Sequence, residues 1–251
     1  MADHTHLQSY QFEEQHFAAW LTSAKGTSFM AQEQQQLAGF MPKAFGHYSV
    51  YVGLNAKLSS SLASPIKNTM ALTTDARLGG DLIMDPHQLP LASEAIDLVV
   101  LQHVLDMSDD PHQTLREAAR VLNAGGRLVI TGFNPYSLWG LLRQLRLKRG
   151  VPWRANFLTQ QRLKDWLRLL SFADFDIKPV YDYAAANGCK RRWLKAFVDP
   201  LGAGYVMSAV KQETRVHLLK THWRKRMLKP SFGLAGATRQ PSPNKQPLET
   251  F

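Results

Sequence analysis

The stretch of residues 81–135, DLIMDPHQLPLASEAIDLVVLQHVLDMSDDPHQTLREAARVLNAGGRLVITGFNP, decides the fold class. Its apolar run 96–101 (IDLVVL) is rich in branched side chains, as is typical of a strand buried on both faces of a parallel sheet. The pair Asp110-Pro111 suits the N-cap and first position of a helix. The glycines at 125–126 are expected to end that helix, and residues 127–131 (RLVIT) predict the next strand. Strand, helix and strand at this spacing predict a right-handed βαβ unit.

The segments on either side predict further strands of the same sheet. Only about nine residues separate the second predicted strand from the third, whereas a parallel crossover normally needs about a dozen or more, including a helix. Either that helix is missing or the pairing of these strands is irregular. A helix from Thr159 to Leu170, capped by Thr159, is expected to precede an antiparallel pair of strands at one sheet edge. The additional predicted strands cover residues 47–53, 68–72, 82–84, 172–180 and 205–210.

The length of 251 residues fits one domain with extensions. We predict a helical cover over residues 1–44, with a helix capped by Thr27 or Ser28 and ended by Pro42. A central α/β domain is expected over residues 45–212, followed by a basic tail at 213–251 that is rich in Pro and Ser and predicted to be disordered.

Composition limits the class of protein. No apolar run approaches the roughly 20 residues that a membrane-spanning helix needs. The polar, acid-containing N-terminus is not expected to be a secretory signal. Cys189 is the single cysteine, which excludes an internal disulfide framework and favours a reducing compartment. These features predict a cytoplasmic protein.

The net charge of +10 is unevenly distributed along the chain. Cations gather in residues 143–154, 190–195 and 211–229, and Trp193 and Trp223 lie among them. Basic segments with interspersed aromatic residues suit phosphate contacts and stacking on RNA, whereas an amphipathic basic helix suits an anionic membrane surface. Three interpretations of the basic segments are therefore possible. They could bind RNA, they could place the protein at a membrane surface, or they could form a basic face that is only solvated.

A combination of motifs in residues 81–135 resembles the core of class I S-adenosylmethionine (SAM) dependent methyltransferases. The resemblance extends to their small-molecule branch, which includes ubiquinone-type C-methyltransferases. The flanks GFNPYSLWGL and GLAGATRQ look like those of an uncharacterised bacterial group within this family. The matching residues are Asp85 with Leu89-Pro90, Asp97-Leu98-Val99-Val100, Leu115-Arg116-Glu117, Arg120-Val121-Leu122 and Gly126.

The resemblance implies an α/β, Rossmann-like fold with a seven-stranded, mostly parallel sheet, helices on both faces and a reversed C-terminal strand. It also implies SAM as the cofactor and a small molecule as the methyl acceptor. The sequence therefore predicts a SAM-dependent methyltransferase. The alternative is a non-catalytic relative that binds RNA, an anionic membrane or a protein through its basic segments.

The first half of the implied cofactor site departs from the family pattern. The family has an acid and a Gly-x-Gly-x-Gly turn after the first strand, where glycines let the backbone approach the cofactor. Here Tyr51 holds the acid position, Gly53 is the one glycine retained, and Asn55 stands within the turn. The second strand should end in an acid that holds the ribose, and Asp75 lies one place beyond the matching positions.

The second half follows the pattern more closely. Asp85 matches the residue that accepts a hydrogen bond from the adenine amino group, and Pro86 and His87 would lie along the ring. Asp before Pro is also a common turn residue, so Asp85 has a structural alternative. Gln102 and the residue after it follow the fourth strand, where the family lines the methyl-transfer site.

His103 and Asp106 are the candidate catalytic residues, because they lie just past the C-terminal end of a predicted strand. Such a pair could remove a proton from a substrate oxygen, nitrogen or carbon during methyl transfer. The alternative is a histidine that is hydrogen-bonded within a loop. The sequence contains no standard metal-ligand spacing, so no metal is expected.

Overall fold

The computed structural model describes residues 20, 23–53, 56, 60–74, 79–137, 156–181 and 202–212. They all belong to one unit, Met1–Thr214. The domain boundaries at residues 44 and 212 remain predictions.

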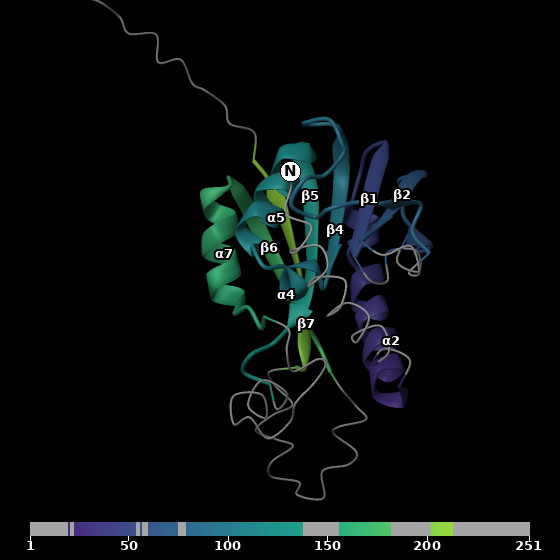
Figure 1. The fold of residues 1–251 in the computed structure, drawn as a ribbon, viewed down its shortest axis with the longest axis vertical. Helices are drawn as coiled ribbons and strands as arrows, with labels where there is room; N and C mark the ends of the chain where they lie inside the picture. Colours follow the sequence, from purple (N-terminus) through teal and green to yellow (C-terminus); the bar gives the residue numbers. More distant parts are fainter. Residues whose placement is uncertain are drawn as a thin grey trace, which may run out of the picture. The chain divides into compact units, whose positions relative to one another are not determined.

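A seven-stranded sheet with the order β3-β2-β1-β4-β5-β7-β6 forms the centre of this unit (Figure 1). The neighbouring strands from β3 to β5 are parallel, and β7 runs antiparallel to both β5 and β6. The predicted fold class is thereby confirmed, including the reversed C-terminal strand. The strands are β1 (Tyr48–Gly53), β2 (Asn68–Thr73), β3 (Leu82–Ile83), β4 (Ile96–Gln102), β5 (Leu122–Phe133), β6 (Phe172–Val180) and β7 (Gly204–Lys211).

The predicted βαβ unit consists of β4, α5 (Pro111–Val121) and β5. Asp110 is the N-cap, and its side chain accepts a hydrogen bond from the Gln113 amide at 3.0 Å. The expected helix end at residues 125–126 is wrong, because α5 already ends at Val121 and Leu122 pairs with β4. The sheet pairing thus begins before the glycines are reached.

The short connection between β2 and β3 joins strands that are parallel after all, with Leu72 opposite Leu82. Asp81 reinforces this edge, since its carboxylate accepts from the Ala71 amide at 2.9 Å and its own amide donates to the Ala71 carbonyl at 2.7 Å. Part of the connection, residues 75–78, lies outside the described residues.

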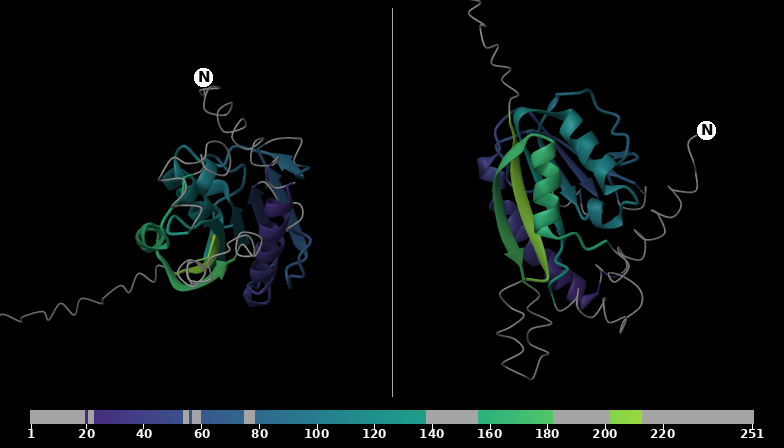
Figure 2. Two further views of the ribbon diagram at one scale, coloured as in Figure 1. Left: turned by 90° about the horizontal axis from the view of Figure 1, so that it is seen from below. Right: turned by 90° about the vertical axis from the view of Figure 1, so that its left-hand side faces the viewer.

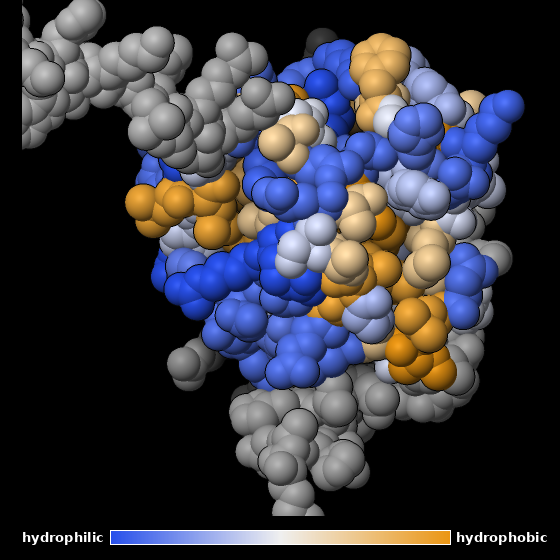
Figure 3. All heavy atoms as spheres, turned by 90° about the horizontal axis from the view of Figure 1, so that it is seen from above, coloured by the Kyte–Doolittle hydropathy of each residue, from blue (hydrophilic) through white to orange (hydrophobic). Residues whose placement is uncertain are grey.

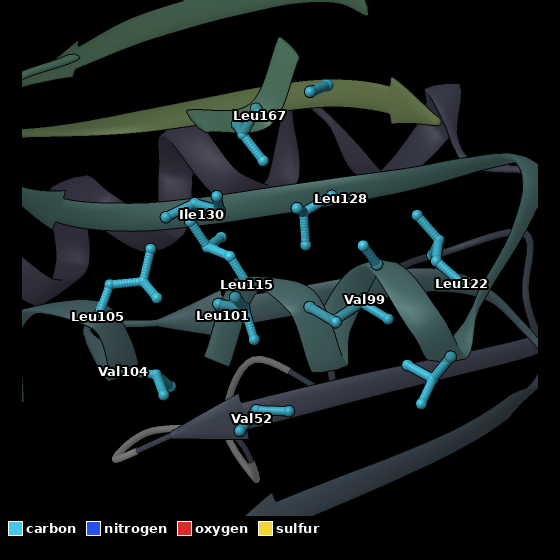
Figure 4. Packing of buried hydrophobic residues seen from close by; sticks show 14 of the residues in the cluster. Val52, Val99, Leu101, Val104, Leu105, Leu115, Leu122, Leu128, Ile130 and Leu167 are labelled. Atoms are coloured by element: carbon cyan, nitrogen blue, oxygen red, sulfur yellow. The ribbon is translucent and has the colours of Figure 1, made fainter. Parts of the chain in front are cut away.

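Alternation along the strands produces two apolar layers, one on each face of the sheet. One layer packs against α5 and against α7 (Gln160–Leu169), and Figure 4 shows Val99, Leu115 and Ile130 meeting within it. The other packs against α2 (Ala24–Ala38) and the 3-10 helix η1 (Met41–Lys43). Helices therefore cover both faces of the sheet (Figures 1 and 2).

The N-terminal helix begins earlier than expected. Ser23, rather than Thr27 or Ser28, caps α2, and its Oγ accepts from the Gly26 amide at 3.2 Å. Pro42 lies within η1, because α2 has already ended at Ala38. The buried side of α2 therefore runs from Phe29 to Leu37 and includes one carboxylate.

Seen from above, the described surface is mainly hydrophilic, with several separate apolar groups (Figure 3). None of the helices in the described part of the chain has the length and apolar character needed to cross a membrane.

Candidate active site

The ends of the four neighbouring parallel strands bring together the polar side chains of the predicted site. Gly53 ends β1, Thr73 ends β2 and Gln102 ends β4, while Asp85 follows β3 after one residue. Open α/β sheets bind their ligands at this carboxyl edge of the strands. We therefore take this edge as the candidate active site.

Gly53 allows β1 to pass very close to β4. Its φ is +124°, and a Cβ atom at this position would lie 2.2 Å from the carbonyl oxygen of Gln102. Tyr51 lies two residues earlier and is buried in the layer under α2, with its hydroxyl 3.1 Å from Met41 Sδ. Burial raises the pKa of Tyr51 to about 12. Its side chain is thus part of the core.

The Asp85 carboxylate organises a turn at the end of β3. Its Oδ1 accepts from the His87 backbone amide at 2.8 Å and lies 2.9 Å from His87 Nδ1. These contacts give Asp85 the turn geometry that was its structural alternative. The Asp85 side chain nevertheless stays 35% exposed, so the carboxylate is open to a ligand as well.

A chain of hydrogen bonds continues from this turn into the core. His87 Nε2 lies 2.9 Å from the hydroxyl of Ser108, which in turn lies 3.0 Å from the hydroxyl of Thr114 on α5. Ser108 is fully buried, so its hydroxyl supports the ring of His87 and has no contact with solvent. The network thereby fixes the turn that carries Asp85.

His103 joins two buried carboxylates at the end of β4. Its Nδ1 lies 2.8 Å from Asp106 Oδ2, and its Nε2 lies 2.7 Å from Glu33 Oε2. The second Glu33 oxygen accepts from the side-chain amide of Gln102 at 2.9 Å. The structure brings His103 and Asp106 into contact and adds a third member from α2.

The backbone around His103 is arranged to hold this geometry. His103 adopts a left-handed conformation with φ of 54°, immediately before the short helix α4 (Val104–Met107). Asp106 Oδ2 also accepts from the Phe133 amide at 3.1 Å, which ties α4 to the end of β5. The ring of Phe133 lies 4.5 Å from the imidazole of His103, between centroids. Charge and packing together fix the imidazole.

The three groups shift one another's ionisation. Burial acts to lower the pKa of His103, but the charge of Glu33 and the hydrogen bonds with Asp106 and Glu33 raise it to about 10. Burial acts to raise the pKa of Glu33, yet the charge and hydrogen bond of His103 hold it below its usual value. Burial dominates at Asp106 and raises its pKa. We expect an imidazolium between two acidic groups at neutral pH.

This charge state implies a pH dependence of stability. Because folding raises the pKa of His103 from 6.5 to about 10, its contribution is complete below pH 6.5 and is lost as the pH rises through about 10. The melting temperature should therefore fall between these values, and it should fall less in His103→Gln. Calorimetric melting of both proteins across this range measures the difference, and parallel curves would contradict it.

The sequence interpretation missed Glu33, which completes the group around His103. One signal was available, because Glu33 is the only acid in the sequence of α2 and lies one turn from Phe29 and Leu37 on its apolar side. A carboxylate in an apolar stripe needs a buried partner. The partner is far away in sequence and could not be read from the helix.

Several predicted residues lie outside the described part of the chain. They include Asn55 and Asp75 of the implied cofactor site, and nearly all of the basic segments 143–154, 190–195 and 211–229. Within the described residues, no group of His, Cys, Asp and Glu has the arrangement of a metal site.

Residues 55–130 match a protein-family model described as "Methyltransferase domain". They include β2 to β4 and most of β5, in the strand order described above. This part of the chain is similar to a methyltransferase domain. The match begins two residues after Gly53 and therefore does not include the single glycine.

One curated relative is similar to about half of the chain. Uncharacterized protein YafS of Escherichia coli (strain K12) is 34% identical over 141 residues, which cover 55% of this chain and 58% of the relative. The chain thus spans less than two thirds of that protein's length.

Two solved structures show the same fold. A SAM-dependent methyltransferase of Thermotoga maritima aligns with a TM-score of 0.55 and 20% identity, covering 72% of this chain and 88% of that one. Geranyl diphosphate C-methyltransferase of Streptomyces coelicolor A3(2), in complex with S-adenosyl-L-homocysteine, aligns with a TM-score of 0.53 and 16% identity, covering 73% and 77%.

Proposed function

We propose that the chain is a SAM-dependent methyltransferase that acts on a small-molecule acceptor. The observation that carries the proposal is the methyltransferase-domain match over residues 55–130, which includes three of the four strand ends of the candidate site. A small acceptor is also what the name of the similar geranyl diphosphate C-methyltransferase states for that protein.

The described polar groups fit the adenosine half of SAM. The partly exposed Asp85 carboxylate binds His87 through Oδ1, and an adenine amino group is the kind of donor that a carboxylate oxygen accepts. Pro86 and His87 extend the same turn and would lie along the ring. Gly53 ends β1 at the same edge of the sheet, where its backbone could contact the ligand.

When bound, SAM supplies an electrophilic methyl group on a sulfonium sulfur. The residues of the chain must orient the acceptor and take up any proton that it loses. His103 and Asp106 are suited to proton transfer because Asp106 orients the imidazole through Nδ1. A base needs a free lone pair, so His103 can act only after Nε2 has lost its proton and separated from Glu33.

Replacing Asp85 by alanine should weaken SAM binding by about 10–100-fold, because a hydrogen bond to a charged acceptor contributes about 1.5–3 kcal/mol. Isothermal titration calorimetry with SAM and S-adenosylhomocysteine measures this loss. Asp85→Asn keeps an oxygen for the turn and should lose less. Asp165→Ala removes an exposed carboxylate on α7 and is the matched control.

Equal affinities for the wild type, Asp85→Ala and Asp165→Ala would contradict the role of Asp85. If the wild type binds neither ligand at high micromolar concentration, the methyltransferase proposal itself fails. The alternative would then be favoured, namely a non-catalytic protein whose basic segments bind RNA, a membrane or a protein.

A further inference from the structure

The carboxylate of Glu33 is fixed by two consecutive residues at the end of β4. Oε1 accepts from Gln102 Nε2 at 2.9 Å, and Oε2 lies 2.7 Å from His103 Nε2. Because Glu33 and its two partners are each 1% exposed, water contributes little to this contact. The two contacts hold α2 against the carboxyl edge of the sheet.

Glu33 occupies the place beside His103 Nε2 that a substrate would need in order to give its proton to this nitrogen. When a carboxylate orients a histidine through one nitrogen, the other nitrogen is the one that exchanges a proton. Asp106 holds Nδ1 of His103 and is itself fixed by the Phe133 amide. Glu33 occupies Nε2, which is the remaining nitrogen.

We propose that Glu33 is a positioning residue that holds His103 Nε2 as a hydrogen-bond donor and keeps this nitrogen protonated, so that His103 becomes a base for a methyl acceptor only after Nε2 has lost its proton. The catalytic part of this inference rests on the proposed function. The contact between Glu33 and His103 does not depend on it.

Methyl transfer requires that one proton leaves Nε2 of His103 and that another returns to it. Nε2 first loses its proton to hydroxide or buffer, and Glu33 stays ionised. When bound, SAM would supply the methyl group, and the acceptor would lose one proton on receiving it. The acceptor's proton passes to the lone pair on Nε2, which restores the imidazolium.

The charged and titratable groups around His103 come from three elements. Glu33 faces it from α2, Asp106 from α4, and Tyr205 of β7 lies beside Asp106 and has a pKa raised well above its usual value by burial and by Asp106. From β5 the contacts are Phe133 and Thr131, which carry no charge. Since an opposite charge in contact shifts a pKa by about 1–3 units, Glu33 should account for a shift of this size.

Glu33→Gln should lower the titration midpoint of His103 by about 1–3 pH units. The midpoint is measured by NMR on protein carrying isotope-labelled histidine, with no ligand present. Glu94→Gln is the charge-matched control, because the Glu94 side chain is 69% exposed and lies apart from this group. It should leave the midpoint unchanged. An equal midpoint in wild type and Glu33→Gln would overturn the proposal.

Glu33→Asp provides a second test, since it keeps the negative charge but shortens the reach to Gln102 and His103. Its midpoint should lie between those of the wild type and Glu33→Gln, and a midpoint at or below that of Glu33→Gln would count against the role of the charge. Glu33→Asp also keeps the proposal testable if the Glu33→Gln protein does not fold.

The pH profile of methyl transfer tests the catalytic part. Because a base must be deprotonated, the wild-type rate should still be rising at alkaline pH, and the Glu33→Gln profile should shift toward acid by the same amount as the NMR midpoint. If Glu33→Gln shifts the NMR midpoint of His103 but leaves the pH profile of methyl transfer unchanged, the role of Glu33 in catalysis is overturned. Failure of the wild type to bind SAM would instead overturn the proposed function.

Discussion

His103→Gln is expected to lower the free energy of unfolding by about 3–5 kcal/mol, because breaking a buried ionic group leaves uncompensated charge in the core. In the wild type the imidazole lies between Glu33 and Asp106, at 2.7 and 2.8 Å. All three side chains are almost completely buried. Glutamine carries no charge and cannot donate to both carboxylates in the same way. Urea unfolding at neutral pH measures the loss.

A double variant separates the charge effect from a loss of packing. Glu33→Gln combined with His103→Gln removes one of the two stranded carboxylates, so it should be more stable than His103→Gln alone. His47→Gln changes an exposed histidine and should stay within about 0.5 kcal/mol of the wild type. A double variant that is less stable than His103→Gln would contradict the ionic interpretation.

The sequence predicted best where local signals and packing agree. The apolar run at 96–101 became β4, and Asp110 caps α5 with its own side chain. Thr159 likewise caps α7 by accepting from the Arg162 amide at 3.2 Å. Each of these features depends on residues within a few positions of one another, so a single segment contains the information.

The errors concern features that depend on contacts across the fold. Residues 125–126 did not end α5, because Leu122 already pairs with β4 and β5 therefore begins before the glycines. Glu33 was missed because its partner His103 lies 70 residues further along the chain. The position of His103 past a strand end could be predicted, whereas the carboxylate on its second nitrogen required the placement of α2.

Gly53→Ala is the second change expected to have a large effect, about 2–6 kcal/mol of destabilisation. The φ of +124° strains any L-residue, and the added Cβ would meet the Gln102 carbonyl oxygen at 2.2 Å and Val104 Cγ2 at 3.1 Å. Backbone strain and overpacking each cost about 1–3 kcal/mol. Because the first contact is with backbone, β1 must move away from β4. Urea unfolding measures the cost.

Gly125→Ala separates these two contributions. Gly125 also has a positive φ, +78°, but no atom lies within 4 Å of the place where its Cβ would stand. It should therefore show the strain alone, about 1 kcal/mol, and the excess at Gly53 is then due to the close approach of the strands. Equal losses would mean that β1 and β4 can separate at little cost. The single glycine would then be retained for the ligand rather than for the sheet, and SAM titration of a folded Gly53→Ala protein would show the loss there.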